Sequence, residues 1–181
     1  MWDAREMKLQ YKVKWCLALS VLLVVSACAP HSAPNSLNTA GMSELRVDIR
    51  EWNRTAAPFV SAYNDQTISA DRLVSLTTPI VKNLENVVAS MHHRDLSALP
   101  PSLQAAFHDI ITSYDNKLSA VNQILVAVQL GNVEAETAAQ AGLARANSEA
   151  ARSVCALAAA AIALDGQSQA DAQAALAADN C

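Results

Sequence analysis

Glycine is scarce in this chain of 181 residues: it occurs four times, at Gly41, Gly131, Gly142 and Gly166. Loops that bind phosphate need several glycines within a few residues, because their backbone N–H groups must approach the anion closely. Glycines this far apart form no such loop. The Walker and Rossmann classes of nucleotide site are therefore excluded.

Basic residues are also few, with 13 Lys and Arg against 17 Asp and Glu, and they form no cluster beyond the extreme N-terminus. Proteins that bind nucleic acids depend on such clusters to neutralise phosphates. The sequence therefore predicts no nucleic-acid partner. Apolar residues make up 52% of the chain and charged residues 17%, which is enough apolar material for one folded domain.

The common signatures of catalysis are missing. A metalloprotease helix needs two histidines one turn apart with a glutamate between them, and His92, His93 and His108 do not have that spacing. The chain also has no Gly-x-Ser-x-Gly elbow, no Cys-x-x-Cys pair and no acidic calcium loop. We predict a noncatalytic protein with no cofactor.

The N-terminal segment has the three-part layout of a secretory signal peptide. Three lysines precede an apolar run over residues 15–25, and small residues follow it. Asp3 and Glu6 do not suit the positive start of such a signal, so we expect translation to begin at Met7. An uncleaved transmembrane helix is the alternative, but the uncharged stretch after Lys14 is shorter than the roughly 20 residues that span a bilayer.

The signal ends in Val25-Ser26-Ala27-Cys28, which resembles the lipobox of bacterial lipoproteins. This resemblance covers only the export signal. It implies that residues 1–27 are removed and that Cys28 receives a diacylglyceryl group and an N-terminal acyl chain such as palmitate. Two or more acyl chains give stable anchoring. We therefore expect a lipid-anchored protein of the cell membrane or outer membrane, with the rest of the chain outside the cytoplasm.

Residues 28–42 contain two prolines and several Ser, Asn and Thr, without apolar periodicity, and are predicted to be a flexible linker. From residue 43 to 181, apolar residues recur at steps of four and three, which is typical of helices that pack in a bundle. The first two predicted helices contain Pro58 and Pro79, where we expect kinks, and Ser69 is a candidate cap for the second. Their expected inward-facing residues are Leu45, Ile49, Trp52, Ala56, Phe59 and Tyr63, then Leu73, Leu76, Ile80, Leu84, Val87 and Met91.

The third predicted helix starts at Pro100–Pro101 and stops at Gly131. The fourth starts after Asn132, carries Glu134 and Glu136 in its first turn, and becomes rich in alanine. Residues 170–178 are predicted to form a short fifth helix. Short connections make neighbouring helices antiparallel, so the sequence predicts an all-α, up-down four-helix bundle with a C-terminal helix. Inward-facing residues of the third helix are expected to be Leu103, Phe107, Ile110, Tyr114, Leu118, Val121, Leu125 and Val128.

Two cysteines remain after Cys16 leaves with the signal and Cys28 is lipidated. Outside the cytoplasm, a pair such as Cys155 and Cys181 is usually a disulfide. A short returning helix after Gly166 would bring the two together. A metal site is the competing interpretation, but no His or Cys lies near either thiol in the sequence.

Two polar groups are candidate sites. His92, His93 and His108 are weak candidates for a metal or haem site, because a helical hairpin brings them together only with strain. Arginines repeat every fourth residue from Arg46 to Arg54, among acidic residues. They form either a recognition stripe or, more often, a solvated face with ion pairs along one helix.

These observations lead to two hypotheses. In the first, a lipid-anchored envelope protein uses its helical bundle to bind a protein or another envelope component at the membrane surface. In the second, the protein carries a small ligand, a metal or haem in the bundle interior, as other helical bundles do.

Overall fold

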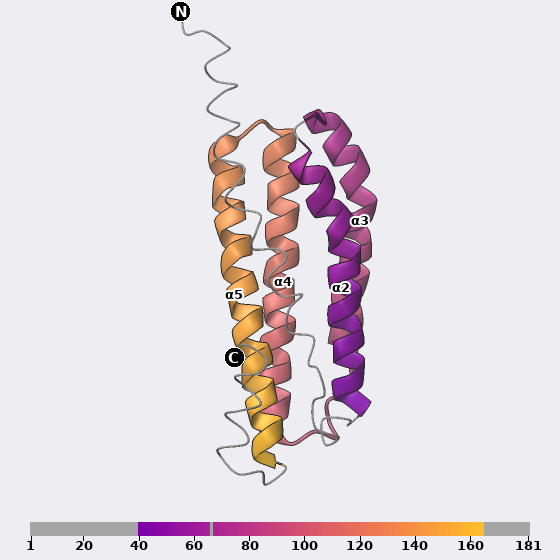
Figure 1. The fold of residues 1–181 in the computed structure, drawn as a ribbon, viewed down its shortest axis with the longest axis vertical. Helices are drawn as coiled ribbons and strands as arrows, with labels where there is room; N and C mark the ends of the chain where they lie inside the picture. The colour runs from indigo at the N-terminus through magenta and orange to yellow at the C-terminus, as the bar shows by residue number, and fades with distance from the viewer. Residues whose placement is uncertain (1–39, 66, 165–181) are drawn as a thin grey trace, which may run out of the picture.

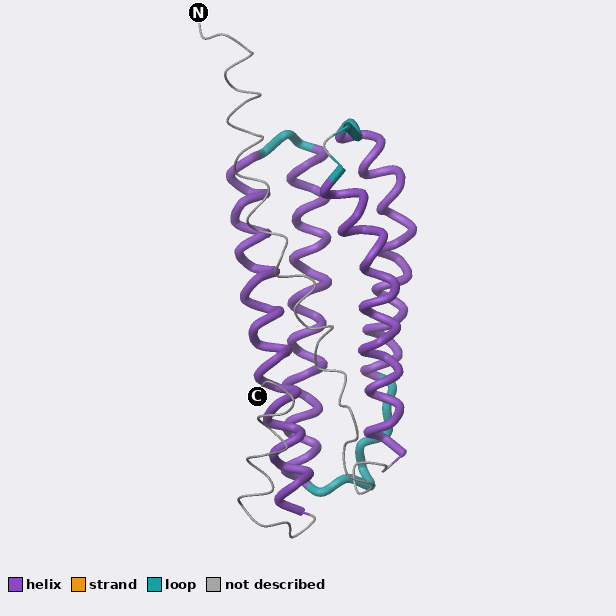
Figure 2. Tube along the Cα trace, viewed as in Figure 1, coloured by secondary structure: helices purple, strands orange, loops and turns teal. Residues whose placement is uncertain are grey.

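The computed structural model describes residues 40–65 and 67–164. This part of the chain forms four helices and no strand: α2 (Ala40–Asn64), α3 (Ala70–His92), α4 (Pro101–Gln129) and α5 (Val133–Leu164). The helices run alternately up and down, and their connections lie at the ends of the bundle (Figure 1; Figure 2). The prediction of an all-α helical bundle is confirmed.

Several predicted features lie outside the described residues. They are the signal peptide of residues 1–27, most of the linker of residues 28–42, the C-terminal helix of residues 170–178, and Cys181. The last three residues assigned to the linker are helical, because α2 begins at Ala40. Among the described helices, none combines the length and the apolarity needed to cross a membrane.

The predicted inward face of α2 is confirmed, with Leu45, Trp52, Phe59 and Tyr63 buried and Ile49 half-buried. In α3 one prediction is wrong. Leu76 is 36% exposed, and its neighbour Thr77 is fully buried instead. Thr77 fits because its hydroxyl donates a hydrogen bond of 2.7 Å to the Leu73 carbonyl, so burial leaves no polar group unpaired.

Two buried residues of α4 also depart from the prediction. Lys117, rather than its half-buried neighbour Leu118, occupies the central position between Tyr114 and Val121. Ile124 is as fully buried as Val121. Steps of three and four from Tyr114 through Lys117 and Val121 to Ile124 keep one face of the helix inward, and the lysine follows this geometry despite its charge.

The helix ends form as the sequence predicts. Ser69 caps α3 by accepting a hydrogen bond from the Arg72 backbone N–H, and Asn132 caps α5 by accepting one from Ala135. Gly131 follows α4 with a φ of 62°, a conformation that suits glycine. The backbone N–H of Asn132 then reaches back 2.9 Å to the Ala127 carbonyl, which is the Schellman arrangement of a helix end.

The two prolines at which kinks are predicted, Pro58 in α2 and Pro79 in α3, lie inside helices, and each helix continues past its proline. Packing supports the helices at these points, since Phe59 and Val81, which follow the prolines closely, are buried in the core. Consecutive helices pack closely along their lengths, and α4 approaches α5 most closely of all. The small side chains of α5 allow this, as at Gly142, where an added Cβ would lie 3.9 Å from the Ala120 Cβ.

Within residues 40–65 and 67–164, the apolar core consists of two clusters. The first surrounds Trp52, Phe107 and Tyr114 and includes Leu96 and Leu99 from the connection between α3 and α4. The second surrounds Phe59, Val121 and Ile124 near the opposite end of the bundle. Lys117 lies on α4 between the two clusters. The interior therefore has a polar level in its middle.

Candidate functional site

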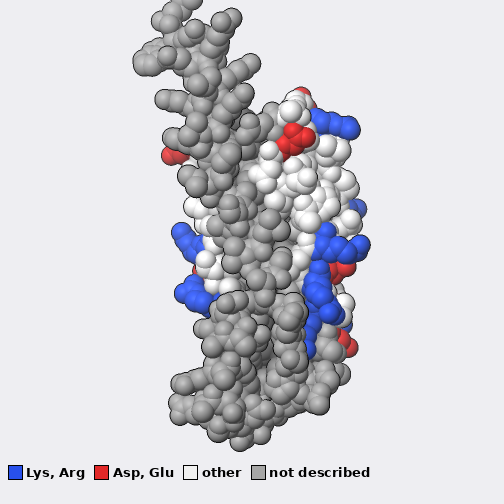
Figure 3. Space-filling model, in the orientation of Figure 1, with Lys and Arg blue, Asp and Glu red and all other residues white. Residues whose placement is uncertain are grey.

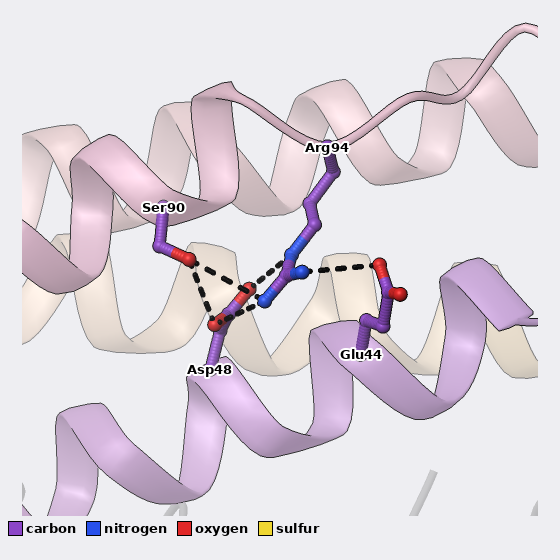
Figure 4. Close-up of polar contacts among 4 residues, drawn as sticks. All are labelled: Glu44, Asp48, Ser90 and Arg94. Atoms are coloured by element: carbon purple, nitrogen blue, oxygen red, sulfur yellow. Dashed lines mark hydrogen bonds and ion pairs between the residues drawn. The ribbon is translucent and has the colours of Figure 1, made fainter.

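A polar cluster joins α2 to the end of α3 (Figure 4). The Arg94 guanidinium donates two hydrogen bonds to the Asp48 carboxylate, of 2.9 Å from Nε and 2.8 Å from an Nη atom, and one of 3.1 Å to Glu44. The Ser90 hydroxyl lies 3.3 Å from Asp48. The hydrogen bonds to Asp48 raise the pKa of Arg94 further above its usual range. This two-point pairing fixes α2 against α3.

A surface groove lies beside this cluster. It has a volume of about 430 Å³, and we call it the α2–α3 groove. Charged, hydroxyl and amide side chains dominate its lining. The two amides, on Asn83 and Asn86, are exposed. The lining residues are Asp48, Glu51, Arg54, Thr55, Asn83, Asn86, Val87 and Ser90.

The arginine stripe of α2 forms a basic band along that helix, visible in the space-filling view (Figure 3). One expected ion pair along the helix is confirmed: Arg54 lies 2.5 Å from Glu51 and lowers the pKa of that carboxyl. Asp48 and Glu44 do not form the ion pairs along α2 that the sequence predicts. They pair with Arg94 of the following connection, because the end of α3 brings its guanidinium over α2.

The three histidines do not converge on one site. His92 lies 3.0 Å from Asp115 on α4, and His93 and His108 are exposed. Across residues 40–65 and 67–164, no group of three His, Cys, Asp or Glu residues is placed to hold a metal ion. Cys155 lies half-buried in α5, and its predicted partner Cys181 is outside the described residues, so their pairing stays a prediction.

Lys117, Tyr114 and Asn147 are buried at the middle of the bundle, beside the buried Ser113, whose hydroxyl donates to the Asp109 carbonyl. Lys117 is 1% exposed, Asn147 of α5 is 4% exposed, and Tyr114 is fully buried. The Lys117 Nζ lies 4.1 Å from the centroid of the Tyr114 ring. Within the described part of the chain, the Tyr114 hydroxyl and the Asn147 amide nitrogen have no hydrogen-bond partner. Burial lowers the pKa of Lys117 to about 7 and raises the pKa of Tyr114.

Another group of polar side chains is buried near the end of the bundle that holds the Gly131 turn. The Tyr63 hydroxyl donates to the Glu136 carboxylate, and Gln140 donates to the Tyr63 oxygen over 2.5 Å. Burial raises the pKa of Tyr63, and its hydrogen bond to Glu136 raises it further. Glu136 lies in the first turn of α5, where the helix dipole favours negative charge, and it also links α5 to α2.

Comparison of the chain with protein-family models, with curated proteins and with solved structures finds no match. The site must therefore be interpreted from its own geometry.

Sequence reasoning missed Arg94, Lys117 and Asn147. For Lys117 a signal existed, because it lies at the same helical spacing as Tyr114 and Val121. Arg94 lies just past the end of a helix and 46 residues from Asp48, so no local pattern relates the two. Asn147 is hidden in an alanine-rich helix whose inward face has little contrast in hydropathy.

Proposed function

We propose that this protein is a noncatalytic, lipid-anchored module of a bacterial cell envelope, which binds a protein or another envelope component through the α2–α3 groove. The observation that carries the proposal is the groove itself. Its lining combines the two exposed amides of Asn83 and Asn86 with an acidic and a basic side chain, Glu51 and Arg54. Such a surface can donate and accept hydrogen bonds to a polar segment of a partner.

Rigidity of the groove supports the same proposal. Asp48 and Ser90 line it and also belong to the Arg94 cluster, so the two helices are fixed beside it by charge-assisted hydrogen bonds. A surface that is already ordered loses less conformational entropy when a partner binds.

Site-specific photocrosslinking in the intact envelope tests the binding surface. A photoreactive residue replaces Asn86 in the groove or, as a matched control, the exposed Ser148 on α5. We expect one crosslinked partner from position 86 and none from position 148. Asn83→Lys, which places a longer charged side chain in the groove, should weaken the crosslink from position 86. Equal crosslinking from both positions would contradict the proposal.

The anchor rests on the Cys28 lipobox and needs a separate test. Cells that express the full chain are fed an alkyne analogue of palmitate and then fractionated. We expect the label on the protein and the protein in the membrane fraction. Cys28→Ser should remove both, while Cys155→Ser keeps both. A Cys28→Ser protein that still carries the label would rule out this anchor.

The second candidate function is transport or storage of a small ligand in the bundle interior. One observation favours it, the buried level that contains Lys117, Tyr114 and Asn147. Helical bundles build such sites from side chains on facing helices. The described histidines give no comparable support to a metal or haem, because they lie apart on the surface.

A further inference from the structure

The buried polar groups of α4 and α5 lie at one level of the bundle. Gly142 faces Ala120 across the two antiparallel helices. Five residues further along α5, Asn147 therefore lies at the height of residue 115 on α4, which is the height of Tyr114 and Lys117. On the other side, the Tyr114 ring meets Trp52 of α2 edge-on, with 5.1 Å between ring centroids.

Three buried groups at this level have hydrogen-bond donors to offer, while the donor of the neighbouring Ser113 is used by the Asp109 carbonyl. The Lys117 ammonium, the Tyr114 hydroxyl and the Asn147 amide nitrogen are donors, and no described carboxylate lies within ion-pair distance of Lys117. A buried cation without a counter-charge is costly, and so is a buried donor without an acceptor. An anion with several acceptor oxygens would offset both costs at once.

We propose that Lys117, Tyr114 and Asn147 form an interior binding site for a small organic carboxylate. The two carboxylate oxygens would accept hydrogen bonds from the lysine and from the tyrosine or asparagine. The rest of the ligand would contact apolar side chains, because the level lies between the two core clusters and beside Trp52. This inference rests on the carrier function proposed above and specifies the class of its ligand. The site is separate from the α2–α3 groove.

Calorimetric titration of the full chain with butyrate and butyramide tests this site. The two probes have nearly the same shape, but only butyrate carries a charge. We expect butyrate to bind at least about tenfold more tightly than butyramide, which corresponds to about 1.4 kcal/mol. Titration with chloride at equal ionic strength checks that a carboxylate is preferred over a simple anion.

Lys117→Met removes the charge at similar volume and should abolish the preference for butyrate. The matched control is Lys82→Met, which removes an exposed lysine from α3 and should leave binding unchanged. Tyr114→Phe removes one donor only, and we expect it to weaken butyrate binding by up to about tenfold. Circular dichroism establishes that each variant is folded before titration.

Three results would overturn the proposal: equal affinity for butyrate and butyramide, equal affinity for butyrate and chloride, or unchanged butyrate binding by folded Lys117→Met. A groove variant separates this test from the proposed partner binding. Asn83→Lys should leave butyrate binding intact, so loss of one function does not imply loss of the other.

Discussion

Two buried charged side chains of this bundle, Asp48 and Lys117, differ in whether a counter-charge lies beside them. Asp48 of α2 is paired through two hydrogen bonds with Arg94, which follows the end of α3. Lys117 lies between the two core clusters, where the Tyr114 ring is its described charge-stabilising neighbour. Arg94 reaches Asp48 because it follows the end of a helix and its side chain remains 24% exposed, whereas the middle of α5 offers Lys117 alanines and an asparagine. A buried charge is thus paired where a connection between helices is near.

The largest effect is expected from breaking the paired charge. Arg94→Ala leaves Asp48 buried without its cation, and we expect it to lower the free energy of unfolding by about 3 kcal/mol. Urea denaturation measures the change. Arg50→Ala, on an exposed part of α2, is the control and should change little. Equal losses in the two variants would show that the Asp48 pairing adds no stability.

Removing the buried lysine charge should have the opposite sign. We expect Lys117→Met to raise the free energy of unfolding by about 2 kcal/mol at pH 6, because it removes a buried cation. The gain should depend on pH. The pKa of Lys117 is about 7 in the folded protein and ordinary, near 10.4, in the unfolded chain.

The direction of that pH dependence follows from proton binding. Below pH 7 both states hold the proton, and the full cost of burying the charge is present. Between about pH 7 and 10.4 the unfolded chain still holds the proton while the folded one does not, so this group makes stability rise with pH. Urea denaturation at pH 6 and pH 9 should therefore show a smaller gain for Lys117→Met at pH 9. A constant gain would contradict the shifted pKa.

Glu136 offers an intermediate case, a buried carboxylate bound by a hydroxyl instead of a cation. Tyr63→Phe removes that donor, and we expect a loss of about 1.5 kcal/mol in urea denaturation. Glu136→Gln keeps an acceptor for Tyr63 and should cost less. If the two variants lose the same stability, an uncharged acceptor does not replace the carboxylate, and the hydrogen bond depends on the charge of Glu136.

The smallest effect is expected for the exposed pair of Arg54 and Glu51. Arg54→Ala should leave the urea midpoint unchanged, because solvent and salt screen this pair. A midpoint shift as large as that of Arg94→Ala would mean that exposure does not distinguish the two arginines.

The sequence was sufficient to predict the fold, because its apolar periodicity, its helix caps and its turn glycine all indicate the same helix boundaries and buried faces. The face that includes Trp52 and Phe59, the Ser69 cap and the stop at Gly131 all form as predicted. The polar interior was harder to predict, because a rule that selects apolar residues chooses Leu76 over Thr77 and Leu118 over Lys117. Only packing shows that a side chain which bonds its own helix, or lies over an aromatic ring, can be buried instead.

Because the structure describes an even number of alternating helices, the first helix begins and the last helix ends on the same side of the bundle. α2 begins and α5 ends toward the same end, and the turn at Gly131 lies at the other (Figure 1). The 29 residues of α4 give it a height of about 43 Å at 1.5 Å per residue. An anchor at Cys28, which precedes α2 in the chain, would join the bundle at the end where α2 begins, and the Gly131 turn would then be the end of the bundle farthest from the attachment point.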